Sequence, residues 1–329
     1  MFHKQIISFV ITENILQIYG LIKRENRSMI EDNITIIKTT FGKFAYDWLL
    51  QSNQVVVWGN TSSGLFLRVH GNRIIFLTNN NHFGPVNVNI QNQIPIQWKN
   101  EDEVQIIHVD REFILTNNKQ QIKLNIENIW NTPQKPTGFI SDIEQKKRLT
   151  QAANQLSLLK NEKGYAPLLL PFVTDTLSLE TDNTWLFSSW NTIKLLKISM
   201  IQKDTESILA LANLLVGSGR GLTPSGDDLL TGLTFMRRRW FPEVNWITEV
   251  ENQLLATFKE KTTSVSSTLF ECALQGEADA RIQEMADVLM STDIPFQQQA
   301  MELSRWGSSS GADVFLGMLV AIEGFQNHI

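Results

Sequence analysis

The first part of the chain, up to about residue 135, alternates short apolar stretches with clusters of turn-forming residues. The stretches are rich in β-branched and aromatic side chains, and Gly, Asn and Ser clusters such as 59–64 and 79–81 separate them. Short stretches at this spacing are typical of an antiparallel sheet or a small barrel. The predicted strands are 54–58, 65–69, 73–77, 86–90, 103–109 and 121–126.

The second part of the chain changes to helical periodicity. From Asn191 onward, apolar residues recur at intervals of three and four, as at Ile193 and Leu196 and again at Ile208 and Leu211. This spacing puts the apolar side chains on one face of a helix. The predicted helices are 141–160, a region from 191 to about 216, and then 224–239, 245–259, 264–275, 281–290, 295–305 and 311–325.

Together these patterns predict an α+β protein. A β-rich N-terminal domain, built as an antiparallel sheet or a small barrel, precedes an α-helical C-terminal domain. The Pro- and Gly-containing segment 133–138 has the composition of a linker. We place the β-rich domain at 1–135, a linker and helical connection at 136–190, and the α-helical domain at 191–329. A length of 329 residues fits two domains better than one core.

The composition indicates a soluble, cytoplasmic protein of bacterial type. Hydrophobic residues make up 42 % and charged residues 19 % of the chain, which argues against wholesale disorder. Thr12, Glu13 and Asn14 interrupt the apolar N-terminus, so we expect no signal peptide. No stretch approaches 18 uninterrupted apolar residues, so we expect no transmembrane helix and no membrane partner.

Charge and cysteine content exclude further classes. A net charge of -5 argues against a nucleic-acid partner, because phosphate binding needs a surplus of Lys and Arg. The basic residues 237–239 fall at the end of a predicted helix, where cations complement exposed carbonyl groups. The single cysteine, Cys272, excludes an internal disulfide and fits a reducing compartment. It lies among apolar residues, so we expect a core residue rather than a nucleophile.

Histidine and cysteine patterns give no zinc site and no catalytic triad. The chain has neither an HExxH nor a CxxC motif. A Ser/His/Asp triad is not expected either, since no histidine lies near the glycine-rich segments along the sequence. We interpret His82, which precedes Phe83-Gly84-Pro85, as a turn residue. The five histidines are His3, His70, His82, His108 and His328.

The densest cluster of unusual residues is GSGRGLTPSGDD at 217–228, between two predicted helices. Its glycines allow positive φ angles and a close approach of a ligand to the backbone. Thr223 and Ser225 are good N-cap residues, and the helix start that follows offers free N–H groups to a phosphate or carboxylate. Arg220 could clamp the same anion. The segment is neither a Walker A loop nor a dinucleotide-binding fingerprint.

Two adjacent carboxylates complicate a simple anion site. Asp227 and Asp228 favour the helix start but would repel a bare phosphate. They are better explained as partners of a bridging Mg²⁺ ion, or as acceptors for an amide or ammonium group. Adjacent helical residues point about 100° apart, so we expect only one of them to face the ligand. Gly232, one turn after Asp228, would leave room above that carboxylate.

The start of the 224–239 helix is echoed near the C-terminus. SGDDLLTG at 225–232 and SGADVFLG at 310–317 share Ser, Gly, Asp and Gly at the same offsets. Two such helix starts could face each other around one ligand. Alternatively, Ser-x-x-Asp forms a capping box in each copy. Capping does not explain the second Gly, which costs a helix about 1 kcal/mol relative to Ala.

A third segment, TTSVSST at 262–268, is rich in hydroxyl groups. At a helix start these groups can cap the helix or bind anionic and amide ligands. Taken alone, the segment favours the simpler interpretation, a solvated helix N-terminus.

These motifs resemble the signatures of a known bacterial family. GSGRGLTPSGDDLLTG, TTSVSSTL with Gly276 following, and GSSSGADVFLG occur in the family's order. The turn at 83–85 and the β-rich first half are similar too, so the resemblance spans most of the chain. The family was long described only as a domain of unknown function. It includes a subunit of the anaerobic oxamate carbamoyltransferase of allantoin breakdown.

In that enzyme, three different proteins together transfer a carbamoyl group between oxamate and phosphate, giving carbamoyl phosphate. The resemblance implies that this chain is a subunit of a carbamoyltransferase-type enzyme. It implies a small anionic substrate, and other subunits of the complex as partners. Two alternatives remain open: a non-catalytic module that binds a small anionic metabolite, and a structural subunit whose glycines only allow close helix packing.

The residues of the candidate site follow from the physical argument and not from the family. We expect Arg220 and nearby N–H groups to hold a phosphate or carboxylate. Asp228 and Asp313 would orient the amide or a Mg²⁺ ion, and these three are the candidate catalytic residues. The sequence demands no cofactor, and it assigns no metal ligands. The predicted ligand-binding residues are Gly217, Gly219, Gly221, Thr223, Ser225, Gly226, Asp227, Thr262, Thr263, Ser264, Ser266, Ser309, Ser310 and Gly311.

Overall fold

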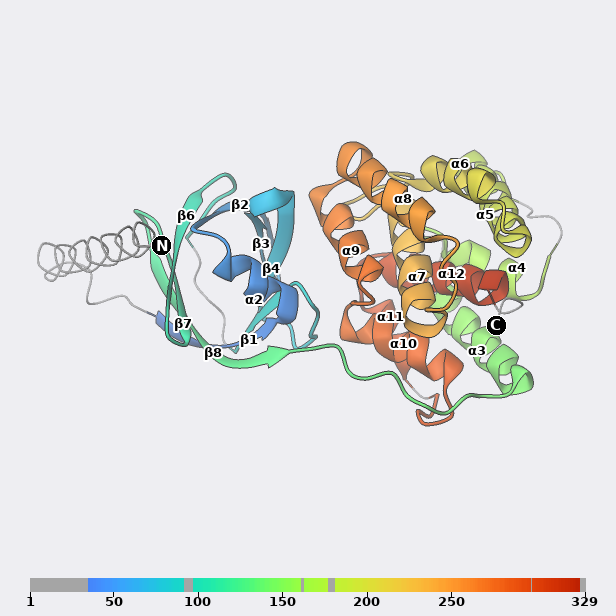
Figure 1. The fold of residues 1–329 in the computed structure, drawn as a ribbon, viewed down its shortest axis with the longest axis horizontal. Helices are drawn as coiled ribbons and strands as arrows, with labels where there is room; N and C mark the ends of the chain where they lie inside the picture. Colours follow the sequence, from blue (N-terminus) through green and yellow to red (C-terminus); the bar gives the residue numbers. More distant parts are fainter. Residues whose placement is uncertain (1–34, 92–96, 161–162, 177–180, 297, 326–329) are drawn as a thin grey trace, which may run out of the picture.

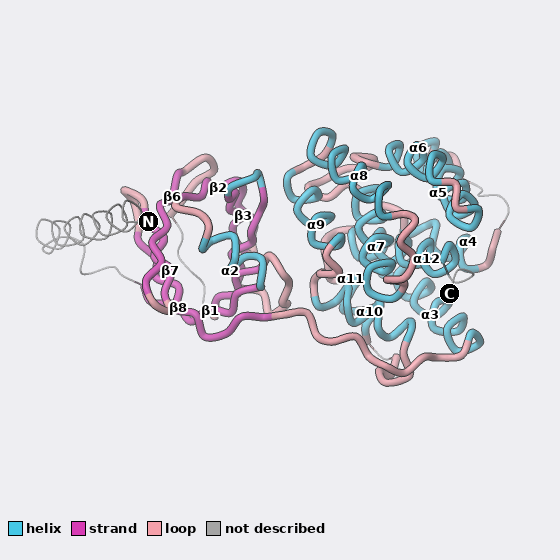
Figure 2. The backbone as a smooth tube through the Cα atoms, in the orientation of Figure 1, coloured by secondary structure: helices cyan, strands magenta, loops and turns pink. Residues whose placement is uncertain are grey.

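The computed structural model describes residues 35–91, 97–160, 163–176, 181–296 and 298–325. Strands gather at one end of the molecule and helices at the other (Figures 1 and 2). This arrangement confirms the α+β class, with a β-rich part followed by a helical part. The prediction about a signal peptide, and residues His3 and His328, lie outside the described residues.

The β-rich part is a closed eight-stranded barrel, so the second of the two predicted sheet forms is observed. Its strands follow the order β1-β5-β4-β3-β2-β6-β7-β8. Neighbouring strands pair antiparallel except β1 with β8 and β4 with β5, which pair parallel. The strands are β1 (Thr35–Gly42), β2 (Gln54–Thr61), β3 (Gly64–Val69), β4 (Arg73–Thr78), β5 (Asn87–Ile90), β6 (Glu103–Val109), β7 (Glu112–Thr116) and β8 (Gln121–Trp130).

Every second side chain along a strand points into the barrel and fills it, as the pleat requires. In β3 the residues alternate between buried and half-buried, with Leu65, Leu67 and Val69 pointing inward. A short helix, α2 (Lys43–Leu50), adds the buried Phe44 and Trp48 to the same core. The sequence analysis missed β1, β7 and α2.

The helical part contains α3 to α12, and its centre is a single pair of helices. Almost every residue of α7 and α12 is buried, and the contact between them is the most extensive of any pair of elements. The helices are α3 (Asp142–Lys160), α4 (Leu169–Val173), α5 (Thr184–Gln202), α6 (Thr205–Leu215), α7 (Ser225–Trp240), α8 (Thr248–Lys261), α9 (Ser264–Leu274), α10 (Ala280–Met290), α11 (Gln299–Ser304) and α12 (Ser310–Phe325).

Two glycines allow α7 and α12 to approach so closely. A Cβ atom on Gly232 would lie 2.1 Å from the carbonyl oxygen of Val314, and one on Gly317 would lie 1.9 Å from that of Leu229. The cost of glycine in a helix is therefore explained by packing. The expectation that Gly232 leaves room for a ligand above Asp228 was wrong, because the backbone of α12 fills that space.

The basic residues at 237–239 lie at the end of a helix, as predicted, and their side chains form ion pairs. Arg237 and Arg238 both pair with Glu251, which is 1 % exposed. Arg239 pairs with Asp287, 2.6 Å away. Buried charges persist in a fold only when they are paired in this way.

The barrel is fixed to the helical part mainly through α9 and β4. The Ile74 N–H donates to Thr268 Oγ1 at 3.0 Å, and the Arg73 guanidinium lies 2.6 Å from the Glu271 carboxylate. Cys272 is 1 % exposed and packs with the barrel core, which confirms it as a core residue. Burial also raises the pKa of its thiol well above the usual value, which disfavours the reactive thiolate.

The connection between the two parts runs along the surface of the helices. The strands end at Trp130 and the helices begin at Asp142. In between, the Gln283 amide donates to Thr132 Oγ1 at 2.9 Å, and the Gly138 N–H donates to the Asp293 carboxylate at 3.0 Å. The domain limits at residues 135 and 190 stay a prediction. Within the described ranges, no helix is both long and apolar enough to cross a membrane.

Candidate functional site

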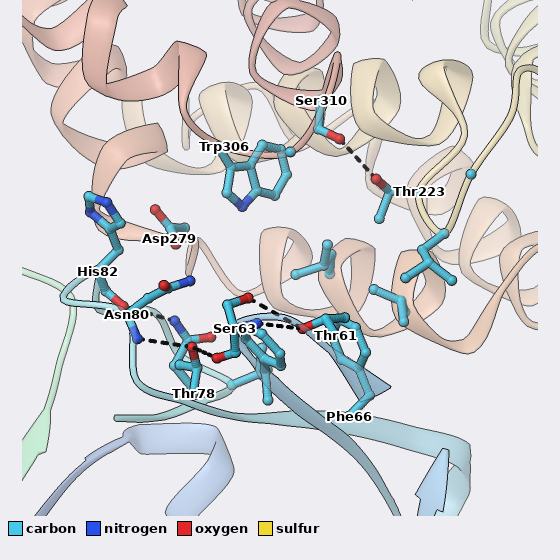
Figure 3. A pocket seen from close by; sticks show the side chains of 18 of the residues that line it. Thr61, Ser63, Phe66, Thr78, Asn80, His82, Thr223, Asp279, Trp306 and Ser310 are labelled. Carbon is cyan, nitrogen blue, oxygen red and sulfur yellow. Dashed lines mark hydrogen bonds between the residues drawn. The ribbon is translucent and has the colours of Figure 1, made fainter. Parts of the chain in front are cut away.

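A cavity of about 480 Å³ lies where the barrel meets the helices (Figure 3). The β3–β4 hairpin and the loop after β4 form its barrel side. The loops before α7 and α12, together with α9 and the start of α10, form the opposite side. The barrel contributes Thr61, Ser63, Phe66, Ile74, Phe76, Thr78, Asn80, His82, Val86 and Asn87. The helical part contributes Arg220, Gly221, Leu222, Thr223, Val265, Thr268, Leu269, Asp279, Arg281, Arg305, Trp306 and residues 307–310.

Three arginines line the cavity, and two of them are paired with carboxylates. Arg281 is paired with Asp279 at 2.8 Å, and Arg305 with Glu302 at 2.6 Å. Arg220 is exposed, and among the described residues it has neither an ion pair nor a hydrogen bond. Arg220 is thus a guanidinium in the cavity wall that is not already neutralised.

The loop that carries Arg220 depends on its glycines. Gly217, Gly219 and Gly221 have φ angles of 74°, 121° and 98°, which other residues rarely adopt. A Cβ atom on Gly219 would also lie 2.6 Å from the Ser225 nitrogen. These glycines shape the loop as the sequence predicted.

The expected side-chain cap of α7 is absent. Pro224 is the N-cap residue, and no side chain accepts a hydrogen bond there. The Thr223 hydroxyl instead lies 3.0 Å from the Ser310 hydroxyl, which joins the loops before α7 and α12 (Figure 3). The capping-box interpretation was therefore wrong for α7.

Asp227 ties the glycine loop to its surroundings. Its Oδ1 accepts from the Gly217 N–H at 2.7 Å, and its Oδ2 accepts from the Thr262 hydroxyl. The side chain is 1 % exposed and does not line the cavity. Burial raises the pKa of Asp227, while the bonds from Gly217 and Thr262 oppose the increase. This residue has a structural role in the loop.

Asp228 and Asp313 are buried between α7 and α12, and neither lines the cavity. Asp313 Oδ1 accepts from the Tyr165 N–H at 2.6 Å, whereas Oδ2 of each aspartate has no hydrogen-bond partner. Burial raises the pKa of Asp313 to about 6. Burial, and then the neighbouring Asp313, raise the pKa of Asp228 well above its usual value.

The two aspartates are arranged reciprocally. Ser310, at the start of α12, acts with Thr223 to lower the pKa of Asp228, and Ser225, at the start of α7, does the same for Asp313. Each carboxyl group therefore lies close to a serine hydroxyl at the start of the other helix. A Mg²⁺ ion bridging these carboxylates to a ligand in the cavity does not fit this arrangement. Among the described residues there is also no group of three or more His, Cys, Asp or Glu side chains that could hold a metal.

The third motif, at 262–268, supports the glycine loop. The Thr263 side chain caps α9 by accepting from the Ser266 N–H at 3.1 Å, and it donates to the Leu222 carbonyl at 2.5 Å. Of this segment only Val265 and Thr268 line the cavity. Ser264 and Ser266 belong to the first turn of α9, outside the cavity lining.

Of the other predicted binding residues, Gly221, Thr223, Ser309 and Ser310 line the cavity. The remaining ones do not line the cavity and pack behind the residues that do. Gly226 and Gly311, for example, pack against the carbonyls of Leu215 and Leu303.

His82 is the most important residue that the sequence analysis misjudged. It does lie in a loop between strands, but its side chain lines the cavity near Asp279 (Figure 3). Burial, and then the positive charge of Arg281, lower the pKa of His82, which favours the neutral imidazole at pH 7. The expectation that no histidine lies near the glycine-rich segments holds along the sequence and fails in space.

Arg305 could have been found from the sequence. It stands five residues before Ser310, just as Arg220 stands five residues before Ser225. Arg281 and Asp279 had no such signal, because they come from the start of α10, outside the three motifs.

Comparison with known proteins supports the resemblance noted above. Residues 215–322 match the family described as oxamate carbamoyltransferase subunit AllH. No solved structure matches the chain. The matched segment runs from the end of α6 into α12 and contains every cavity-lining residue of the helical part. In its α7–α12 region, this chain is therefore similar to the family of the oxamate carbamoyltransferase subunit AllH.

Proposed function

We propose that this chain is a subunit of a carbamoyltransferase-type enzyme, and that the cavity between barrel and helices binds its small anionic substrate. Oxamate, carbamoyl phosphate or a closely related anion is the substrate class. A family of subunits implies partner subunits, which we expect to complete the enzyme. The observation that carries the proposal is Arg220, an uncompensated guanidinium on a glycine loop inside the cavity.

The chemistry of the cavity suits an anion that also carries an amide. A phosphate or carboxylate needs a cation and N–H donors, which Arg220 and the glycine loop offer. The amide needs acceptors, and the hydroxyls of Ser310 and Thr223 can accept as well as donate. The buried carboxyl groups of Asp228 and Asp313 would then act through these hydroxyls, as positioning residues.

His82 adds a group that could move a proton. A neutral imidazole is the usual general base near pH 7. His82 and Arg220 line the same cavity. Replacing His82 by Gln should lower turnover by about 10²- to 10⁴-fold if it transfers a proton. Binding of the substrate should change much less.

The first test is ligand-dependent thermal unfolding of the full chain. A ligand at 100 times its dissociation constant stabilises the folded state by about 2.7 kcal/mol. We expect such a shift with carbamoyl phosphate or oxamate, and we expect Arg220→Gln to weaken binding by about 10- to 100-fold. Arg111→Gln is the matched control, because Arg111 is exposed on the barrel, away from the cavity.

The proposal fails if neither anion binds the full chain or its complex with the partner subunits. It fails equally if Arg220→Gln binds and turns over like Arg111→Gln. Turnover is measured as the oxamate-dependent release of phosphate from carbamoyl phosphate with the partner subunits present, where oxamate accepts the carbamoyl group.

One observation favours a second candidate, a binding module without chemistry of its own. Both candidate catalytic aspartates lie outside the cavity wall. In that case the anion should bind and Arg220→Gln should abolish binding, while the His82→Gln enzyme complex should keep its full turnover.

A further inference from the structure

The segments α6–α7 and α11–α12 are built alike. In each, a helix ends, a glycine-containing loop follows, and a second helix begins with Ser-Gly. A Cβ atom on Gly226 would lie 2.0 Å from the Leu215 carbonyl oxygen, and one on Gly311 would lie 2.0 Å from that of Leu303. Each helix start therefore packs on the last turn of the helix before it.

The likeness extends to the contacts that hold each loop. The Gly226 N–H donates to the Ser218 carbonyl at 2.8 Å, and the Gly311 N–H donates to the Trp306 carbonyl at 3.0 Å. α7 and α12 also exchange reciprocal glycine contacts, so the two segments pack against each other as a pair.

The repeat places one arginine in each of the two loops that line the helical side of the cavity. Arg220 and Arg305, both five residues before the serine of their helix, line the cavity from the two loops. The loops touch through the Thr223 and Ser310 hydroxyls, which lie 3.0 Å apart. Asp279 is paired with Arg281, and Glu302, which does not line the cavity, is paired with Arg305.

We propose that the two loops form two anion subsites in one cavity, one around Arg220 and the other around Arg305. The inference rests on the proposed carbamoyltransferase role. It adds that this chain holds two small anions at once, side by side, in place of one. A cavity of about 480 Å³ has the size of sites that hold drug-like molecules, and a single small anion would fill it poorly.

The test measures oxamate binding by calorimetry with the full chain, at increasing concentrations of inorganic phosphate. Two subsites predict that oxamate still binds when phosphate is saturating, with an affinity changed by no more than a few-fold. Arg220→Gln and Arg305→Gln should each weaken one of the two anions by about 10- to 100-fold and leave the other within a few-fold.

A third variant tests the second subsite without removing its cation. Glu302 does not line the cavity, but it pairs with Arg305. Glu302→Gln should therefore free Arg305 and tighten the binding of the same anion that Arg305→Gln weakens.

The outcomes separate this inference from the proposed function. If phosphate and oxamate compete, so that the apparent dissociation constant rises in proportion to phosphate, the cavity has one subsite and the inference is wrong. The proposed function would then stand, because both anions still bind. If Arg305→Gln leaves both affinities unchanged, the second subsite is also refuted. If neither anion binds the full chain, the inference is wrong, and the same measurement with the partner subunits present then decides the proposed function.

Discussion

The close contact of α7 and α12 predicts that replacing Gly317 by Ala destabilises the protein. In an ordinary helix this change is stabilising by about 1 kcal/mol, because Ala is the better helix former. Here the new Cβ would lie 1.9 Å from the Leu229 carbonyl oxygen and 2.8 Å from the Leu233 nitrogen. Both are backbone atoms of α7, so no side-chain rotation relieves the overlap.

The magnitude follows from the distance. A carbon and a carbonyl oxygen need roughly 3.3 Å, so α12 must move away from α7 by more than about 1 Å. Overpacking of a close-packed core costs about 1–3 kcal/mol, and this case involves two rigid helices, so we take the upper value. After the gain in helix propensity, we expect a net loss of about 2 kcal/mol.

Thermal and urea unfolding, followed by circular dichroism, measure this loss. A loss of about 2 kcal/mol lowers Tm by roughly 4–8 °C for a domain of this size. Gly324→Ala in the same helix is the matched control. Its Cβ would meet the end of the flexible Met200 side chain at 2.7 Å, which can move aside at small cost.

A Gly317→Ala protein as stable as the wild type would refute the reasoning. It would mean that the second glycine of the repeated motif is not kept by helix packing. A role in ligand binding would then return as the explanation. Equal losses in Gly317→Ala and Gly324→Ala would be as damaging, because the argument depends on backbone contact at one position only.

Three further predictions concern buried carboxyl groups. The folded-state pKa of Asp313, about 6, exceeds the ordinary value of 3.8. Between these two pH values the folded state therefore binds more protons than the unfolded state. The free energy of unfolding should then fall as pH rises from about 4 to 6. Asp313→Asn should make this slope shallower in urea unfolding at pH 4, 5 and 7, and an unchanged slope would contradict the assignment. Asp287→Asn should leave Arg239 buried without its charge partner and lower the unfolding free energy by about 3–5 kcal/mol; a loss below about 1 kcal/mol would count against a buried pair. Asp227→Asn should speed amide hydrogen exchange at Gly217 and weaken anion binding, whereas exchange at the wild-type rate would show that the carboxylate does not hold the loop.

Much of the fold could be predicted because its elements repeat a simple pattern. The predicted strand 103–109 coincides with β6, and the predicted helix 311–325 differs from α12 by one residue. The elements that were missed are short and bury only one face. In β1 only Ile37, Thr39 and Phe41 point inward, so the strand carries too few apolar residues to be recognised.

The long-range order of the barrel was not accessible to sequence reasoning. Two of its strand pairs are parallel, and β1 closes the barrel against β8 from the other end of the domain. Local patterns record which residues face inward, but they carry no information on which strands become neighbours.

The sequence predicted the loops that border the cavity, but not which side chains reach it. Glycines and helix starts can be recognised from spacing, which led to Arg220 and Ser310. Burial cannot be recognised from spacing. Asp228 and Asp313 were therefore predicted to contact the ligand, whereas neither lines the cavity. His82 comes from the barrel, about 140 residues before the glycine loop, so only the folded chain brings the two together.

The connection between barrel and helices has a consequence for how a ligand and a partner meet this molecule. This segment is held against α10 and its flanks by a hydrogen bond that Gln283 donates and by bonds that Asp293 and the Met290 carbonyl accept. A connection held by these hydrogen bonds does not act as a hinge. The cavity between the barrel and the helices is therefore formed before a ligand binds. A ligand enters through a standing opening and spends little of its binding energy on ordering the protein. The partner subunit that we propose would, in turn, dock onto one body with a fixed outline.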